Sequence, residues 1–339
     1  MSESPSIQII GHGLAGAILA ETLSVAGLTL SVFDDGGRAS SQVAAGMFTP
    51  LTGQRMIASW ALDEALPEVQ QFYPALEKSS GGSFFHPQST LRIFRSQKEA
   101  DEWHSRGDQR FTQSIDASAF PFHLPFGACE ITGGGWVNLP PMLEALKKRR
   151  QEQGQWGKRD QADITLWAEG VRASENPLWK DVGWRNAQGD ILTLHIPGLA
   201  EDRIYNFGKF LVPLGNQRFR CGATYAWDEP SPEPREAGRT EIETSLSEIL
   251  QLPFEVCDHQ SGLRPVAIAR VPVAGPHPEQ SDQWIFNGFG SKGVLLAPWM
   301  AERMRAYIQT GTPLPKECIA ARRIQRQRDR EKTRRIKHR

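Results

Sequence analysis

The spacing of apolar residues changes twice within the first 34 positions of the chain. Residues 7–10 form a short apolar run, residues 14–26 follow a helical spacing that ends at Gly27, and residues 28–33 form a second run. Short runs of this kind are typical of buried strands, and a glycine often follows the last turn of a helix. The pattern therefore predicts a strand, a helix and a second strand, with Asp34 directly after the second strand.

The middle of the chain carries the signals of an antiparallel sheet. Residues 207–225 predict two strands joined at Gly215-Asn216, a pair that is common in hairpin turns. Residues 191–196 predict a further strand before this hairpin. We therefore expect a β-rich region between two segments that mix strands and helices.

Two later helices are also predicted. Thr240, with Glu243 three residues later, has the spacing of a capping box at the start of an amphipathic helix. A longer helical pattern follows Gly293, with Pro298 early in it, where the missing N–H costs little.

The first predicted strand leads into GHGLAG, residues 11–16, which is a G-x-G-x-x-G motif. In such a motif Gly11 permits the tight turn, Gly13 lets the backbone approach a pyrophosphate, and Gly16 lets helix and strand pack closely. Asp34 stands where a carboxylate can accept hydrogen bonds from the ribose of an adenine nucleotide. An acid there disfavours the 2′-phosphate of NADP and leaves NAD and FAD open. His12 is expected to be an exposed residue of the turn.

A second glycine-rich turn, FNGFGSKGVLLAPWM, covers residues 286–300 near the other end of the chain. The free N–H groups at a helix N-terminus and the helix dipole both favour an anion. Lys292 would add a positive charge to this turn. The chain therefore carries two candidate anion sites that lie far apart in the sequence.

Composition describes an ordinary folded protein of 339 residues with a formal net charge of zero. From Cys318 to Arg339 ten Lys and Arg outnumber two acids, so this tail carries +8 and the preceding residues −8. No segment has the length of a membrane span, and the polar N-terminus does not resemble a signal peptide. The four cysteines are far apart, which argues against zinc or a disulfide framework and suits the cytoplasm.

Five segments together resemble the D-amino-acid oxidase family of flavoenzymes, which includes glycine oxidase, sarcosine oxidase and part of a bacterial tRNA-uridine-modifying enzyme. They are DDGGRASSQVAAGMFTPLTGQRM, ITGGGWVNLPPMLEAL, GATYAWDE, SGLRPV and GFGSKGVLLAP. The resemblance implies a mixed α/β protein with a Rossmann-like FAD-binding domain and an interleaved antiparallel-sheet substrate domain. The flavin domain would combine residues 1–58, 128–176 and 256–315, the substrate domain residues 59–127 and 177–255, and a basic tail residues 316–339.

The resemblance also implies the cofactor site, in which the first glycine turn holds the pyrophosphate and the second faces the pyrimidine edge of the flavin. FAD would be bound without a covalent link, because no cysteine occupies the attachment position of sarcosine oxidase, and no metal is expected. The predicted cofactor-binding residues are Gly11, Gly13, Leu14, Ala15, Gly16, Asp34, Asp35, Ser40, Ser41, Ala45, Gly46, Met47, Gly288, Gly290, Ser291, Lys292, Gly293 and Val294.

Three residues are predicted to act on the substrate. Arg264 matches the arginine that binds the substrate carboxylate in glycine oxidase, where a planar guanidinium suits paired hydrogen bonds. Arg55 matches an arginine near the flavin in sarcosine oxidase. Lys292, near a helix N-terminus, would stabilise the negative charge of a reduced flavin. This chain departs from the family in having Ser291 instead of a second arginine and a short segment at 147–168.

Three functions remain open at this stage. The first is oxidation of the C–N bond of a small amine or amino acid by hydride transfer to flavin. The second is oxidation of an aminomethyl-carboxylate group on a tRNA uridine, with RNA held by the basic tail. The third is a flavin-binding protein without turnover that serves a partner.

Overall fold

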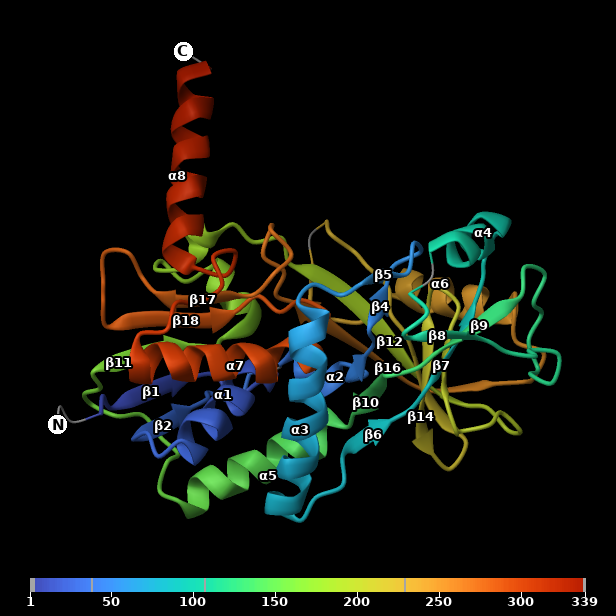
Figure 1. The fold of residues 1–339 in the computed structure, drawn as a ribbon, viewed down its shortest axis with the longest axis horizontal. Coiled ribbons are helices and arrows are strands. Elements are labelled where there is room, and N and C mark those ends of the chain that lie inside the picture. Colours follow the sequence, from blue (N-terminus) through green and yellow to red (C-terminus); the bar gives the residue numbers. More distant parts are fainter. Residues whose placement is uncertain (1–3, 38, 107, 229, 338–339) are drawn as a thin grey trace.

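The computed structural model describes residues 4–37, 39–106, 108–228 and 230–337, and two large sheets organise it (Figure 1). The smaller sheet has the order β17-β18-β11-β1-β2, and β1, β2, β11 and β18 run parallel while β17 is antiparallel to β18. Its strands are β1 (Ile7–Ile10), β2 (Leu30–Phe33), β11 (Ile164–Trp167), β17 (Val273–Pro276) and β18 (Gln283–Asn287).

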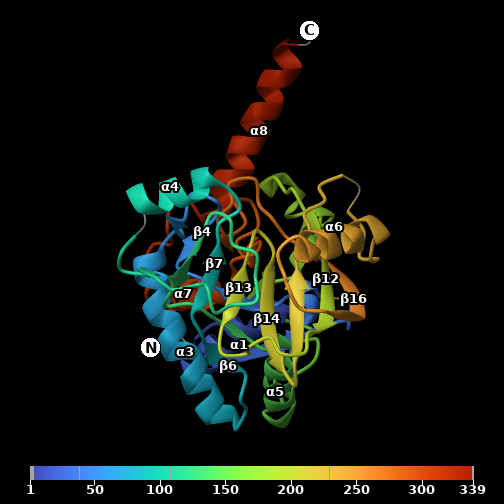
Figure 2. The ribbon, with the colours of Figure 1, turned by 90° about the vertical axis from the view of Figure 1, so that its right-hand side faces the viewer.

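The larger sheet has the order β16-β12-β15-β14-β13-β7-β9-β8 and is antiparallel except for the pair of β13 and β7. Figure 2 shows several of these strands side by side. They are β7 (Thr90–Ile93), β8 (Thr112–Ser114), β9 (Ala128–Ile131), β12 (Ala187–His195), β13 (Ile204–Asn206), β14 (Phe210–Gly215), β15 (Arg218–Gly222) and β16 (Glu255–Arg264).

Two small sheets and the helices complete the described chain. The small sheets pair β3 (Met47–Phe48), β10 (Gly135–Val137) and β6 (Phe85–Pro87), and β4 (Leu51–Thr52) with β5 (Ile57–Ala58). The helices are α1 (Leu14–Val25), α2 (Ser40–Val43), α3 (Leu62–Ser80), α4 (Gln97–Arg106), α5 (Leu139–Glu152), α6 (Glu236–Ser247), α7 (Gly293–Thr310) and α8 (Ala320–Lys337), with 3-10 turns η1 (Gly170–Ser174) and η2 (Lys180–Val182).

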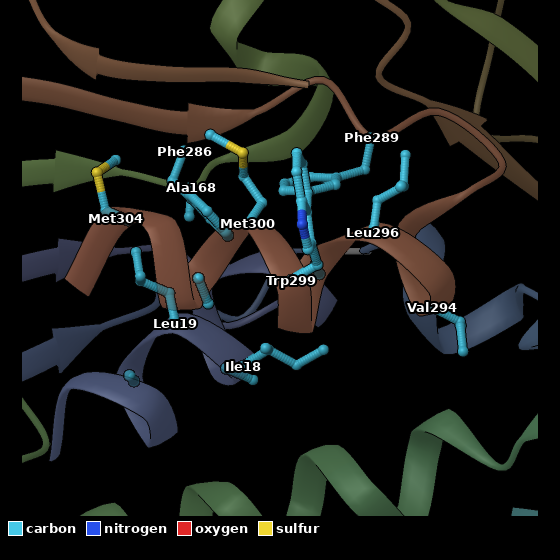
Figure 3. Close-up of a cluster of buried hydrophobic side chains, with 14 of the residues drawn as sticks. Ile18, Leu19, Ala168, Phe286, Phe289, Val294, Leu296, Trp299, Met300 and Met304 are labelled. Atoms are coloured by element: carbon cyan, nitrogen blue, oxygen red, sulfur yellow. The ribbon is translucent and has the colours of Figure 1, made fainter. Parts of the chain in front are cut away.

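The β1-α1-β2 unit confirms the strand–helix–strand pattern of the first 34 residues. Its helix packs against α7, although the two lie almost 270 residues apart in the sequence (Figure 3). Ile18 and Leu19 of α1 share one buried cluster with Met300 and Met304 of α7. This apolar contact brings the second glycine turn next to the first, because each turn directly precedes one of the two helices.

The two faces of the smaller sheet are covered by different elements. Neighbouring residues of β18 point to opposite faces: Phe286 belongs to the cluster under α1 and α7, and Ile285 to a separate cluster. That second cluster includes Trp179, beside η2, and Ile324 of α8. The first turns of the basic tail are therefore part of the core.

The remainder of α8 projects away from the body of the molecule (Figures 1 and 2). Its base is held by Arg323, which is buried and donates to the carbonyls of Glu317, Val271 and Pro272 at 2.7–3.1 Å. Arg328 adds ion pairs to Glu279 and Asp181. No helix in the described residues is long and apolar enough to cross a membrane.

Three local predictions need correction. The hairpin turn is centred on Asn216 and Gln217, whose φ angles are +55° and +59°, one residue later than expected. Helix α6 begins at Glu236, so Thr240 lies inside it and caps nothing, because the chain already turns into helix after Arg235. Pro298 stands at the sixth position of α7, deeper than the first turn.

Buried Tyr73 compensates for Pro298. A residue with an N–H at position 298 would donate to the carbonyl of Val294, and proline cannot. The hydroxyl of Tyr73 donates to that carbonyl instead, at 3.0 Å, from helix α3. The helix therefore continues through the proline without leaving a buried carbonyl unsatisfied.

The division into two discontinuous domains stays a prediction. Strands β9 and β16, which begin the predicted flavin segments 128–176 and 256–315, pair within the larger sheet. The predicted boundaries therefore assign strands of the larger sheet to both predicted domains.

Candidate active site

A cavity of about 700 Å³ is lined by residues from both large sheets. The smaller sheet contributes Gly11, Asp34 and Ala168, which follow the carboxyl ends of β1, β2 and β11. Ligands bind at this edge in open parallel sheets of the doubly wound type. The larger sheet contributes residues of β7, β9, β12, β13, β14, β15 and β16. A ligand in the cavity would therefore touch both sheets at once.

The first glycine turn is shaped by close backbone contacts. A Cβ on Gly11 would lie 2.5 Å from the carbonyl oxygen of Ala168, and one on Gly16 would lie 2.0 Å from that of Gly11. Neither position can therefore carry a side chain without a shift of the backbone. Gly13 differs, since the nearest atom to its Cβ would be the Ser41 hydroxyl at 3.3 Å, and Gly13 lines the cavity.

The two acids after β2 have different surroundings. The carboxylate of Asp34 lines the cavity and accepts the backbone N–H groups of His12 at 2.6 Å and Gly36 at 2.8 Å. Asp35 does not line the cavity and forms an ion pair with Arg172, whose hydrogen bond lowers the pKa of this carboxyl group. Asp34 is therefore the acid available to a ligand in the cavity.

The expected exposure of His12 is wrong. Its ring packs edge-on against Trp156 at 5.0 Å, and its Nε2 is buried without a hydrogen-bond partner. Burial lowers the pKa of His12 to about 4, so the ring is neutral at pH 7. Trp156 belongs to the short 147–168 segment. It is held beside His12 because Val32 of β2 exchanges backbone hydrogen bonds with Gln155 and Gly157.

The segment after α2 passes beside the cavity in a conformation that requires glycine. Gly46 has φ +69°, and a Cβ there would lie 1.9 Å from the carbonyl oxygen of Val137. Ser41 accepts the backbone N–H of Leu14 at 3.3 Å, which links this segment to the start of α1. The predicted residues of the segment that line the cavity are Ser40, Ser41, Ala45, Gly46 and Met47.

The second glycine turn reaches the same cavity through Gly290, Ser291, Lys292, Gly293 and Val294. Gly288 lies outside the cavity lining and packs near Val273, Ala267 and Trp184. A Cβ on Gly293 would lie 2.8 Å from Leu14, so the N-termini of α1 and α7 are in direct contact. Neither helix has a capping side chain or an acid in its first turn. Both positive helix ends therefore face one cavity, where they favour an anionic ligand.

Lys292 and Arg264 are the predicted cations that line the cavity. Burial lowers the pKa of both side chains. Within the described chain the side chain of Lys292 has no hydrogen-bond or ion-pair partner, and the guanidinium of Arg264 forms no ion pair with a carboxylate. The guanidinium of Arg264 donates to the carbonyl of Thr224 at 3.1 Å and stacks on the ring of Tyr225 at 4.3 Å. Neither cation contacts a carboxylate, and Asp190 acts on Arg264 only from beyond ion-pair distance, where it raises the pKa of the guanidinium. A ligand can supply the missing contact.

Arg55 is placed differently from Arg264. It lies in the exposed turn between β4 and β5, and its neighbours Gln54 and Met56 line the cavity while Arg55 does not. The prediction that it acts on the substrate is untested.

Several cavity residues were missed in the sequence. Glu169 follows β11, and burial raises the pKa of its carboxyl group. The sequence signal for it is its place after a parallel strand beside β1. The other missed residues with charged side chains are Arg92, Arg95, Arg172 and Lys209. Of the described His, Cys, Asp and Glu residues, no three gather as they would around a metal ion.

Comparison with known proteins identifies the family. A model of the family DAO, described as FAD dependent oxidoreductase, matches residues 6–307. The chain therefore belongs to the DAO family of FAD-dependent oxidoreductases, and FAD is its cofactor. The resemblance inferred from the five sequence segments is confirmed, and so is the mixed α/β fold.

Two curated relatives differ in how much of their length the chain spans. It is 22% identical to glycine oxidase of Pseudomonas aeruginosa, over 87% of this chain and 92% of that protein. It is 25% identical to the bifunctional protein MnmC of Caulobacter sp., named for tRNA 5-methylaminomethyl-2-thiouridine biosynthesis, over 93% of this chain. The chain spans 56% of that relative's length.

Solved structures show the same fold. Iminodiacetate oxidase from Chelativorans sp. superposes with a TM-score of 0.74 at 18% identity, covering 91% of this chain and 97% of that one. Glycine oxidase from Geobacillus kaustophilus has a TM-score of 0.73 at 18% identity, covering 92% and 96%.

The cavity fits FAD. The uncapped end of α1, with Gly13 open to the cavity, suits the pyrophosphate, and Asp34 suits the ribose hydroxyls. Gly46 has no side chain, so its backbone can lie close to the flat isoalloxazine ring. The N-terminus of α7, with Lys292, suits the electron-rich pyrimidine edge of that ring. These are the residues that would hold the cofactor.

Proposed function

We propose that the protein oxidises the C–N bond of a small amine that bears a carboxylate. The observation that carries the proposal is Arg264, a cation in the lining of the cavity that lacks a carboxylate partner within the described chain. A carboxylate at Arg264 would hold the substrate by charge-assisted hydrogen bonds and fix its orientation. Bound FAD supplies the hydride acceptor. The substrate loses a hydride from carbon and a proton from nitrogen, and water hydrolyses the resulting imine.

The side chains around the substrate would prepare the amine for this step. Only the unprotonated amine releases a hydride readily, since its nitrogen lone pair must be free. Arg264 and Lys292 are positive, and like charges disfavour the ammonium form of a nearby amine. The carboxylate clamp and the second cation would thus orient the substrate and keep its nitrogen neutral.

Replacement of Arg264 tests the proposal. Arg264→Ala should retain FAD but reduce it far more slowly with amino acids, by on the order of 2–5 kcal/mol in transition-state free energy. Amines without a carboxylate should be affected much less. The measurement is anaerobic loss of flavin absorbance with both substrate classes.

Arg185 provides the matched control for this experiment. Its guanidinium also stacks on an aromatic ring, that of Trp227 at 4.6 Å, but it does not line the cavity. Arg185→Ala should therefore leave both rates unchanged. Equal losses for the two substrate classes in Arg264→Ala would contradict a carboxylate clamp, and absence of reduction by any amine would favour a flavin-binding protein without turnover.

A second candidate is oxidation of an aminomethyl-carboxylate group on a tRNA uridine. Two observations favour it: the match to MnmC, and the projection of α8 away from the body with most of the tail's positive charge. Lys and Arg on such a helix would neutralise RNA phosphates. In this reading the same cavity would accept the uridine side chain and Arg264 its carboxylate.

A further inference from the structure

The charged side chains of the cavity are divided by sign. Its acids, Asp34 and Glu169, follow β2 and β11 at the nucleotide end. Along the edge of the larger sheet, the charged residues of the described lining are all cations. They are Arg92, Arg95, Lys209 and Arg264. The end of the cavity that would receive the substrate is therefore positive.

Two of these four cations already have counter-ions. Arg92 is buried and forms an ion pair with buried Glu99 at 3.2 Å. Lys209 forms an ion pair with Glu241 and donates to the carbonyl of Ala223. Their charges are therefore largely neutralised within the protein. The guanidinium groups of Arg264 and Arg95 form no ion pair among the described residues, although the backbone N–H of Arg95 donates to the carboxylate of Glu99 at 3.2 Å.

Arg95 lies just after β7 in a setting that matches that of Arg264. A Cβ on Gly208 would lie 2.8 Å from Nη1 of Arg95, and a Cβ on Gly189 would lie 2.1 Å from Nη2 of Arg264. Each guanidinium thus lies against a glycine whose missing side chain makes room for it. The side chain of Arg95 has no hydrogen-bond partner among the described residues, and Arg95 is exposed while lining the cavity. It can therefore meet a ligand that enters from solvent.

We propose that Arg95, over Gly208, is a second anion site of the substrate cavity. The substrate class is then an amine with two acidic groups, one bound by Arg264 and the other, a carboxylate or phosphonate, by Arg95. This inference rests on the proposed function for the role of Arg264. A second anionic group would supply the guanidinium of Arg95 with the ion pair that the described chain does not give it.

Binding of acids that cannot be oxidised tests the second site independently of turnover. The FAD-loaded protein is titrated with acetate, with the dicarboxylates from malonate to adipate and with the corresponding phosphonoalkanoates, and binding is followed by the flavin difference spectrum. A diacid of preferred length should bind roughly tenfold more tightly than acetate, as expected for one added charge-assisted contact. Arg95→Ala and Arg95→Gln should abolish that preference and leave acetate binding within about twofold.

Lys98 is the matched control, because it is an exposed cation three residues from Arg95 that does not line the cavity. Lys98→Ala should retain the preference for diacids. Diacids that bind wild type no more tightly than acetate would overturn the proposal, as would equal weakening of acetate and diacids in Arg95→Ala. If diacids are preferred but no amine reduces the flavin, the anion site stands and the proposed oxidation fails.

Discussion

His12, in the first glycine turn, makes the stability of the folded chain depend on pH. In the folded chain its pKa is lowered from 6.5 to about 4, chiefly by burial. Between these two pH values the unfolded chain binds a proton that the folded chain does not, so stability falls as pH is lowered through this window. Above pH 6.5 this contribution is fully present.

Replacement with an uncharged ring should remove this pH dependence. In His12→Phe the edge-on contact with Trp156 can persist, while no proton is taken up at this position on unfolding. The loss of unfolding free energy between pH 6.5 and 4 should be smaller than in wild type by on the order of 2 kcal/mol. Urea unfolding of both flavin-free proteins at several pH values measures the difference. Parallel curves for the two proteins would contradict the buried, neutral state of His12.

Helix α7 illustrates how one element depends on another for its hydrogen bonds. Tyr73→Phe should leave the carbonyl of Val294 without a donor in a buried position, at a cost of about 1–3 kcal/mol. The control is Tyr307, which lies on α7 itself and whose hydroxyl makes no hydrogen bond within the described chain. Tyr307→Phe should change stability little. Denaturant midpoints compare the variants. A Tyr73→Phe protein as stable as wild type would show that another group serves this carbonyl.

The first turns of helix α8 pack against the body of the protein and the rest projects from it. This difference determines where the chain can be truncated without disturbing the core. Removal of all residues from 318 would expose the core, because Cys318, Ala320 and Ile324 are buried. Truncation after Asp329 instead removes six of the ten cations of the tail and leaves this base in place. If the tail binds RNA, the truncated protein should keep its FAD while losing much of a salt-sensitive affinity for tRNA. Filter binding at several salt concentrations decides this, and unchanged affinity would count against the tail as an RNA contact.

At the scale of the whole molecule, prediction from sequence succeeded where the signal was contiguous. The unit from β1 to Asp34 could be predicted because motif, helix and strands follow one another within about 30 residues. Arg95 and Glu169 could not be found in this way, since their place in the cavity depends on pairing between distant strands. Strand β7, before Arg95, pairs with β13, and β11, before Glu169, pairs with β1.

The exact positions of one turn and one helix start were predicted wrongly for a different reason. The shifted hairpin turn at Asn216 and the earlier start of α6 reflect local choices among nearly equivalent residues, which tertiary contacts decide. The burial of His12 could not be predicted, because Trp156 reaches its ring only where the chain after α5 returns to the edge of β2.

The contact between α1 and α7 has a consequence for how the protein is made on the ribosome. Strand β18 and the start of α7 complete the smaller sheet and the cavity, and they are synthesised some 250 residues after α1. The nascent chain must therefore hold an incomplete parallel sheet, with its apolar faces uncovered, for most of translation. If residues 290–294 hold the flavin, as predicted, FAD can be captured only once they have emerged, and from then on it stabilises the folded state by mass action. The yield of folded protein should therefore rise when riboflavin is supplied during expression, which a comparison of yields with and without riboflavin measures.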